Sequence, residues 1–136
     1  MKIVQKEFGV RTHSRTEMID VTSQVQGVVR DAGIREGDAI VFCPHTTAAV
    51  TINENADPSV VHDMLMVFDE VIPRSHPGYR HAEGNSDAHC KSSLVGCSEQ
   101  VLIGNGALTL GTWQGIYFCE FDGPRGRTVI VQVRGE

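Results

Sequence analysis

The sequence has no long run of apolar residues. A membrane-spanning helix needs about 20 predominantly apolar residues in succession, and polar or charged residues interrupt every apolar stretch well before that length. The first residues alternate charged and apolar types and lack the apolar segment of a secretory signal. We therefore expect no membrane association and a cytoplasmic location.

Paired cysteines and an excess of basic residues are also missing. The four cysteines (Cys43, Cys90, Cys97 and Cys119) form no CxxC pair, so in a chain without a secretory signal we interpret them as free thiols. Lysine and arginine number 12 against 17 aspartates and glutamates, which gives a net charge of −5. Nucleic-acid binders usually present a strongly basic face, so we expect no nucleic-acid partner.

Three common catalytic or nucleotide-binding motifs are absent: GxGxxG, the P-loop and GxSxG. There is no internal repeat and no composition typical of a linker. A chain of 136 residues is long enough for one substantial core, so we predict a single domain over residues 1–136.

Two segments have the apolar spacing of a helix. The first begins near Asp20 or Thr22, carries an apolar stripe from Val21 to Ala32 and ends at Gly33. The second begins at Asp57, a favourable N-cap followed by proline, and ends before Pro73. The other periodic segments resemble strands, and they lie at 2–12, 38–42, 48–52, 100–103, 107–110, 116–121 and 128–133.

Two turn sequences predict hairpins. Gly104-Asn105-Gly106 separates the strands at 100–103 and 107–110, and residues 122–126 (DGPRG) separate those at 116–121 and 128–133. Two helices and about seven strands, unevenly distributed, indicate an α+β fold with largely antiparallel sheets.

A polar run occupies residues 74–93 (RSHPGYRHAEGNSDAHCKSS). It contains three of the six histidines, two carboxylates and Asn85, and it has no apolar periodicity. A compact domain seldom keeps so long a connection unless it binds something or is disordered, and this composition is not typical of disorder. We therefore interpret it as a loop that carries a site.

Residues 41–55 form a second polar block, in which strands lead into His45-Thr46-Thr47 and out to Asn53-Glu54-Asn55. Neutral imidazoles bind zinc and similar metals, and catalytic sites often use three protein ligands. His81 and His89 from the polar run, together with His45, supply that number. A polar loop with hydrogen-bonded histidines remains the alternative.

A third block contains the only tryptophan, in LGTWQGI (110–116), followed by EFDGPRGR (120–127). Arg125 can bind a phosphate or carboxylate through paired N–H donors. For Arg127 we favour a solvated arginine in a tight hairpin turn.

These blocks together resemble the YjbQ family. The matching segments are HTTAAVTINE (45–54), YRH to GNSDAH (79–89), SSLVG (92–96), LTLGTWQGI (108–116) and EFDGPR (120–125). Several separate and unusual blocks in the same order are a stronger signal than any one of them. The resemblance covers nearly the whole chain.

The resemblance implies an α+β fold with sandwich-like packed sheets, assembled as a homotrimer. It also implies a polar pocket near the subunit boundary that binds a divalent transition metal, with zinc as the first expectation and His45, His81 and His89 as ligands. Family members are associated with a weak thiamine-phosphate synthase activity, which joins an aminopyrimidine diphosphate to a thiazole phosphate and releases diphosphate.

Two classes of function follow from these predictions. In an enzyme, Asp87 or Glu54 acts as acid or base, and Thr46, Asn85 and Arg125 hold a small phosphorylated substrate. Metal-assisted hydrolysis of a small molecule would use the same groups. The alternative is a non-catalytic trimer that binds a small ligand or a structural metal.

Overall fold

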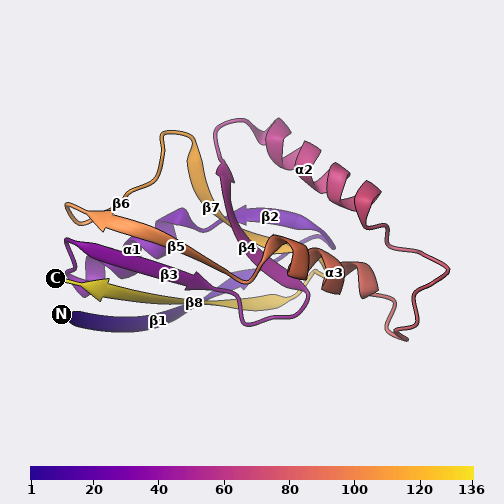
Figure 1. Ribbon diagram of the computed structural model, residues 1–136, viewed down its shortest axis with the longest axis horizontal. Helices are drawn as coiled ribbons and strands as arrows, with labels where there is room; N and C mark the ends of the chain where they lie inside the picture. The colour runs from indigo at the N-terminus through magenta and orange to yellow at the C-terminus, as the bar shows by residue number, and fades with distance from the viewer.

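Two antiparallel sheets form the frame of the computed structural model, which describes residues 1–136. The larger sheet has the order β1-β8-β3-β5-β6, with strands Lys2–Arg11, Gly126–Gly135, Gly37–Phe42, Ser98–Gly104 and Ala107–Leu108. The smaller sheet has the order β2-β7-β4, with strands Glu17–Asp20, Gln114–Glu120 and Ala48–Glu54. The helices are α1 (Thr22–Ala32), α2 (Pro58–Val71) and α3 (Ser86–Val95). The two chain ends lie side by side, because β1 pairs with β8 (Figure 1).

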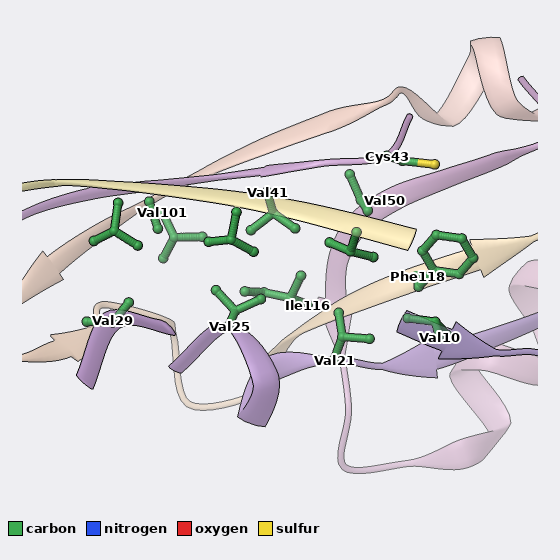
Figure 2. Close-up of a cluster of buried hydrophobic side chains, with 14 of the residues drawn as sticks. Val10, Val21, Val25, Val29, Val41, Cys43, Val50, Val101, Ile116 and Phe118 are labelled. Atoms are coloured by element: carbon green, nitrogen blue, oxygen red, sulfur yellow. The ribbon is translucent and has the colours of Figure 1, made fainter. Parts of the chain in front are cut away.

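The main core lies between the larger sheet, α1 and the smaller sheet. Figure 2 shows Val25 and Val29 of α1 facing Val41 and Val101 of the larger sheet, with Ile116 of β7 beside them. The α1 valines recur at helical spacing, and the strand residues alternate inward and outward, so both periodicities deliver apolar side chains to one space.

The central strand of the smaller sheet, β7, is buried on both faces. The second face of this sheet carries Ala49, Tyr117 and Cys119, which pack with Phe121 and with Ala88 of α3. Leu65 and Phe68 of α2 pack against the same cluster. Gly115–Glu120 of β7 is continuously buried, because a strand covered on both faces has no solvent side.

Both predicted helices are confirmed. At the start of α1, Asp20 accepts the Thr22 N–H, and Gly33 ends the helix at φ 68°. At the start of α2, Asp57 accepts the Ser59 N–H next to Pro58. No residue of α2 is fully buried, so the predicted apolar face is only partly covered within this chain.

The first hairpin is confirmed and the second is wrong. Asn105 and Gly106 both have positive φ between β5 and β6, as the two-residue turn requires. β7 and β8, however, belong to different sheets. The segment between them bonds instead to the β1–β2 connection: Thr12 N–H donates to the Arg125 carbonyl, and Gly123 N–H donates to the Arg15 carbonyl.

The interpretation of residues 74–93 as one loop is wrong for its second half, where α3 begins at Ser86. This third helix was missed because its inward residues are not an apolar stripe. Asp87, Ala88, Lys91 and Ser92 are buried at helical spacing, and three of the four are polar. The fold class is nevertheless α+β with antiparallel sheets, as predicted.

Two further expectations concern membranes and cysteines. None of the three helices has the length and apolar composition to cross a bilayer. All four cysteines are free thiols, with Cys43 and Cys119 buried and Cys90 and Cys97 exposed.

Candidate functional site

A polar hollow forms where three segments distant in sequence meet: the β3–β4 connection, the region before and at the start of α3, and the segment from the end of β7 into β8. It has a volume of about 330 Å³, and all of its lining residues except Pro44 are polar or charged. Its lining residues are Pro44, His45, Thr46, Thr47, Glu83, Asn85, His89, Asp122, Arg125 and Arg127. Figure 1 shows α3 beside the β3–β4 connection and the first residues of β8.

A second hollow, of about 500 Å³, adjoins the first and shares His45, Thr46 and His89 with it. Its remaining lining residues are Ala48, Ser92, Ser93, Gly96 and Cys97, so it contains no Asp, Glu, Lys or Arg side chain. We call the first the charged hollow and the second the uncharged hollow. They meet at the imidazoles of His45 and His89.

A backbone hydrogen bond sets the tautomer of His45. Its Nε2 accepts the Thr128 N–H at 2.9 Å, so the proton of the neutral ring is on Nδ1. Burial and the nearby charge of Arg127 lower the pKa of His45. His45, which lines both hollows, thus has its N–H donor on Nδ1 and no free ring nitrogen.

The three predicted metal ligands do not form a metal-binding group within one chain. His81 and His89 lie edge to face with ring centroids 5.4 Å apart, but Nε2 of His45 is occupied by Thr128. No group of three or more His, Cys, Asp or Glu side chains is placed to hold a metal ion. The three-histidine site stays a prediction, and no chemistry below depends on a metal.

Asn85 and Arg125, predicted to bind substrate, share one carboxylate. Asn85 Nδ2 donates to Asp122 Oδ2 at 2.8 Å, and an Arg125 terminal nitrogen donates to the same oxygen at 3.0 Å. Asn85 is buried, whereas half of the Arg125 side chain is exposed. Arg125 can therefore turn toward a ligand, while Asn85 is held in place.

Asp87, predicted as an acid or base, lies in a buried ion cluster. Arg15 donates both terminal nitrogens to its carboxylate at 3.1 Å, and Lys91 Nζ lies 3.6 Å away. Lys91 also pairs with Asp69 of α2. Burial opposes ionisation of Asp87, but the hydrogen bonds and charge of Arg15 outweigh it and lower the pKa. No imidazole is hydrogen-bonded to Asp87, and its catalytic role stays a prediction.

The other predicted residues lie in different places. Thr46 borders both hollows, and its carbonyl accepts the Ser92 hydroxyl of α3. Glu54 lies at the far end of β4, a strand of seven residues that spans about 20 Å. The structure thus brings His45, Thr46, Asn85, His89 and Arg125 together and leaves Glu54 apart from them.

Arg127 is not solvated, which corrects the sequence interpretation. It is only 6% exposed and is paired with the fully buried Glu120. Its terminal nitrogen also donates to Thr47 Oγ1 at 2.9 Å, and Glu120 accepts the Thr12 hydroxyl and the Asp122 N–H. The pair therefore ties the Thr47 side of the polar hollow to the Asp122 side.

Sequence reasoning missed the partners of these buried charges. Asp87 and Lys91 are spaced as an i,i+4 ion pair, a usable signal once a helix is recognised there. Arg15 has no such local signal, because Asp87 is 72 residues away in sequence. Glu120 and Arg127 are only seven residues apart, but the predicted hairpin turn placed Arg127 in solvent.

Comparison with known proteins identifies the family. The profile described as UPF0047 protein YjbQ-like matches residues 6–136. The chain belongs to this family. It is 56% identical over 130 residues to the UPF0047 protein YugU of Bacillus subtilis, covering 96% of this chain and 98% of the relative. It is 47% identical over 130 residues to a UPF0047 protein of Methanocaldococcus jannaschii, covering 96% and 94%.

Solved structures of YjbQ-like proteins have the same fold. A Clostridium acetobutylicum family member described as uncharacterized has a TM-score of 0.93 at 53% identity, covering 95% of this chain and 99% of the other. A Sulfolobus solfataricus protein described as YjbQ-like and of unknown function has a TM-score of 0.94 at 32% identity, covering 99% of each chain.

Proposed function

We propose that this YjbQ-family protein is an enzyme that joins two small molecules, at least one of them phosphorylated, with a thiamine-phosphate synthase-like activity. The main observation in support of this proposal is that two adjoining hollows share His45, Thr46 and His89. A reaction between two substrates requires two neighbouring binding volumes with reacting groups at their boundary. The charged hollow is suited to the phosphorylated group, and the uncharged one to a neutral ring.

Three features of the charged hollow support binding of a phosphoryl group. Arg125 is exposed enough to present its planar N–H donors. The start of α3 has no side-chain cap, and the free N–H groups of a helix start favour an anion. His45 adds a neutral N–H donor. These donors can stabilise charge that develops on a departing diphosphate.

The proposed reaction needs no acid or base for its central bond change. The thiazole nitrogen supplies the electron pair for a new bond to the pyrimidine methylene carbon, and diphosphate leaves with the electrons of the carbon–oxygen bond. The residues around the hollows therefore need chiefly to position the two rings and to stabilise the leaving group. That requirement fits a site rich in hydrogen-bond donors.

The test is thiamine-phosphate formation from the two precursors by tag-free protein. We expect Arg125→Met to lower kcat/KM by about 10²-fold, the usual effect of removing one donor to a developing negative charge. Arg134→Met is the matched control, because Arg134 pairs with Asp38 near the C-terminal end of β8, away from both hollows. A wild-type protein without turnover would contradict the assignment.

A non-catalytic binding protein is the second candidate, and the placement of the carboxylates favours it. Asp87 is engaged by Arg15 and Lys91, and Glu54 lies at the far end of β4. Any reaction that requires Asp87 or Glu54 as a free base is therefore poorly served. Binding of both precursors in calorimetry without product formation would support this candidate.

The proposal includes a homotrimer and rests there on incompletely covered apolar surfaces. The outer face of the larger sheet exposes Ile3, Phe42 and Leu102, and α2 exposes Met66 and Val71. Burying such residues between copies of the chain would be favourable. Light scattering should give a mass near three times the 14.9 kDa of one chain; a single-chain mass at micromolar concentration would contradict it.

A further inference from the structure

The side chain of Asn85 has one unsatisfied polar atom. Asn85 is 8% exposed and borders the charged hollow. Its Nδ2 donates to Asp122, but its Oδ1 is buried and has no hydrogen-bond partner. It is the only buried side-chain nitrogen or oxygen in the structure of which this is true. Such exceptions often mark functional sites.

The surroundings determine which end of the amide is free. Asp122 Oδ2 also accepts a hydrogen bond from Arg125, so this oxygen serves as an acceptor. The amide must therefore turn its NH₂ group toward Asp122, and the carbonyl oxygen is left over. The free atom is an acceptor, which needs an N–H or O–H from elsewhere.

The fold also prevents the usual local solution. An asparagine that precedes a helix normally accepts an N–H of the first turn, yet no side chain caps α3. The N–H of Ala88, one of those that a capping side chain accepts, bonds instead to the Asn85 backbone carbonyl. To cap the helix with its side chain, Asn85 would have to rotate away from Asp122.

The charged groups that line the hollow indicate which donor fits. The carboxylates of Asp122 and Glu83 line the same hollow, and together with a carbonyl oxygen they favour a positively charged amino group. Arg125, on the other side of Asp122, favours a phosphoryl group. Because Asn85 and Arg125 share a single carboxylate oxygen, the two groups of the ligand must be only a few bonds apart.

We propose that the charged hollow recognises a small molecule that carries an amino group close to a phosphoryl group, with Asn85 Oδ1 accepting a hydrogen bond from the amino nitrogen. This inference rests on the proposed phosphoryl-binding function. It adds a specificity rule: a phosphorylated ligand without the amino group leaves Oδ1 unsatisfied and binds more weakly.

Two probes of equal size test this rule. O-phosphoethanolamine carries both groups, and propyl phosphate replaces the ammonium with a methyl group. Titrations followed by the backbone amide NMR signals of Gly84 and Ser86 should show phosphoethanolamine binding about tenfold more tightly, as expected for one additional charge-assisted hydrogen bond. Equal affinities in the wild-type protein would overturn the inference.

Variants separate the hydrogen bond from general attraction by the carboxylates. Asn85→Ala should abolish the preference for phosphoethanolamine, whereas Asn53→Ala, an exposed asparagine on β4, should preserve it. A preference that survives in Asn85→Ala would overturn the role of Oδ1. The wild-type comparison needs no variant, so the rule can be tested even where Asn85→Ala does not fold.

Failure of the proposed function would look different. If neither probe nor inorganic phosphate shifts the amide signals, the hollow binds no phosphoryl group, and both proposals fall. If propyl phosphate and inorganic phosphate bind as well as phosphoethanolamine, the phosphoryl site stands and only the amino-group rule falls.

Discussion

Two clusters of hydrogen-bonded polar side chains lie at the charged hollow. They differ in whether every buried polar atom has a hydrogen-bond partner within the protein. In the Glu120–Arg127 pair, both carboxylate oxygens and the guanidinium have protein partners, and Thr12 and Thr47 complete the arrangement. In the Asn85–Asp122–Arg125 group, by contrast, one buried acceptor has no partner and the arginine is half exposed.

This difference distinguishes polar side chains that stabilise the fold from polar side chains that are available to bind a ligand. A buried polar group whose partners all come from the protein contributes to a unique structure. A polar cluster that is held in place but contains a buried atom without a hydrogen-bond partner is arranged to bind a group from outside the chain. The following predictions test whether the first group is structural and the second is available for binding.

The largest effect is expected for Arg127→Met. It leaves the Glu120 carboxylate buried without its cation, which typically costs about 3–5 kcal/mol of unfolding free energy. Urea unfolding measures the loss. Arg125→Met, at an exposed pair with Asp122, should cost no more than about 1 kcal/mol. Similar losses in both variants would erase the distinction between the two groups.

Asp87→Asn should have the next largest effect. Arg15 and Lys91 lose a charged acceptor, and hydrogen bonds to charged groups contribute about 1.5–3 kcal/mol, so the melting temperature should fall measurably. Turnover at a temperature where the variant remains folded provides the control. An unchanged melting temperature with a 10²–10⁴-fold loss of turnover would instead identify Asp87 as an acid or base.

Acid sensitivity should depend on Glu120. Burial opposes its ionisation, but hydrogen bonds from Arg127, Asp122 and Thr12 outweigh it and lower its pKa. A lowered folded pKa contributes stability above the unfolded value of about 4.3, and this stability is lost as pH falls through the folded pKa. Urea unfolding between about pH 2 and 6 should show a shallower loss in Glu120→Gln than in the wild type. Identical pH profiles would contradict this.

The smallest effect on stability is expected when the predicted histidine ligands of the metal are changed. The three-histidine prediction requires that any divalent metal in tag-free protein be lost both from the His81→Ala, His89→Ala double variant and from His45→Ala, for which His45 would have to release the Thr128 N–H from its Nε2. Elemental analysis of each variant measures this, with His62→Ala of α2 as the control. Metal kept in His45→Ala would exclude His45 as a ligand, and metal kept in the double variant would contradict the whole site.

Local signals predicted a large part of the fold. Asp57-Pro58 located the start of α2, Gly33 located the end of α1, and Asn105-Gly106 located the first hairpin turn. Each of these is set by backbone conformation or capping within a few residues. The candidate site was predicted in part for a similar reason: His45, Asn85 and His89 stand in polar blocks that no core explains.

The errors arose where charges are buried or where backbone hydrogen-bond partners are distant in sequence. α3 places Asp87 and Lys91 on its inner side, so a search for apolar periodicity missed the helix. The second hairpin failed because the segment after β7 bonds to Thr12 and Arg15, more than a hundred residues away in sequence.

The sequence by itself determined the family, the strand and helix segments with apolar periodicity, and the residue types available for a site. Only the tertiary structure decided which polar residues are satisfied. Whether Arg127 is solvated or paired depends on how β8 lies relative to Glu120 of β7 and to Thr47, which is 80 residues away in sequence. The partner of the Asn85 amide, Asp122, is 37 residues away. Hydrogen bonds and ion pairs act over a few ångströms in space, and no local pattern specifies those contacts.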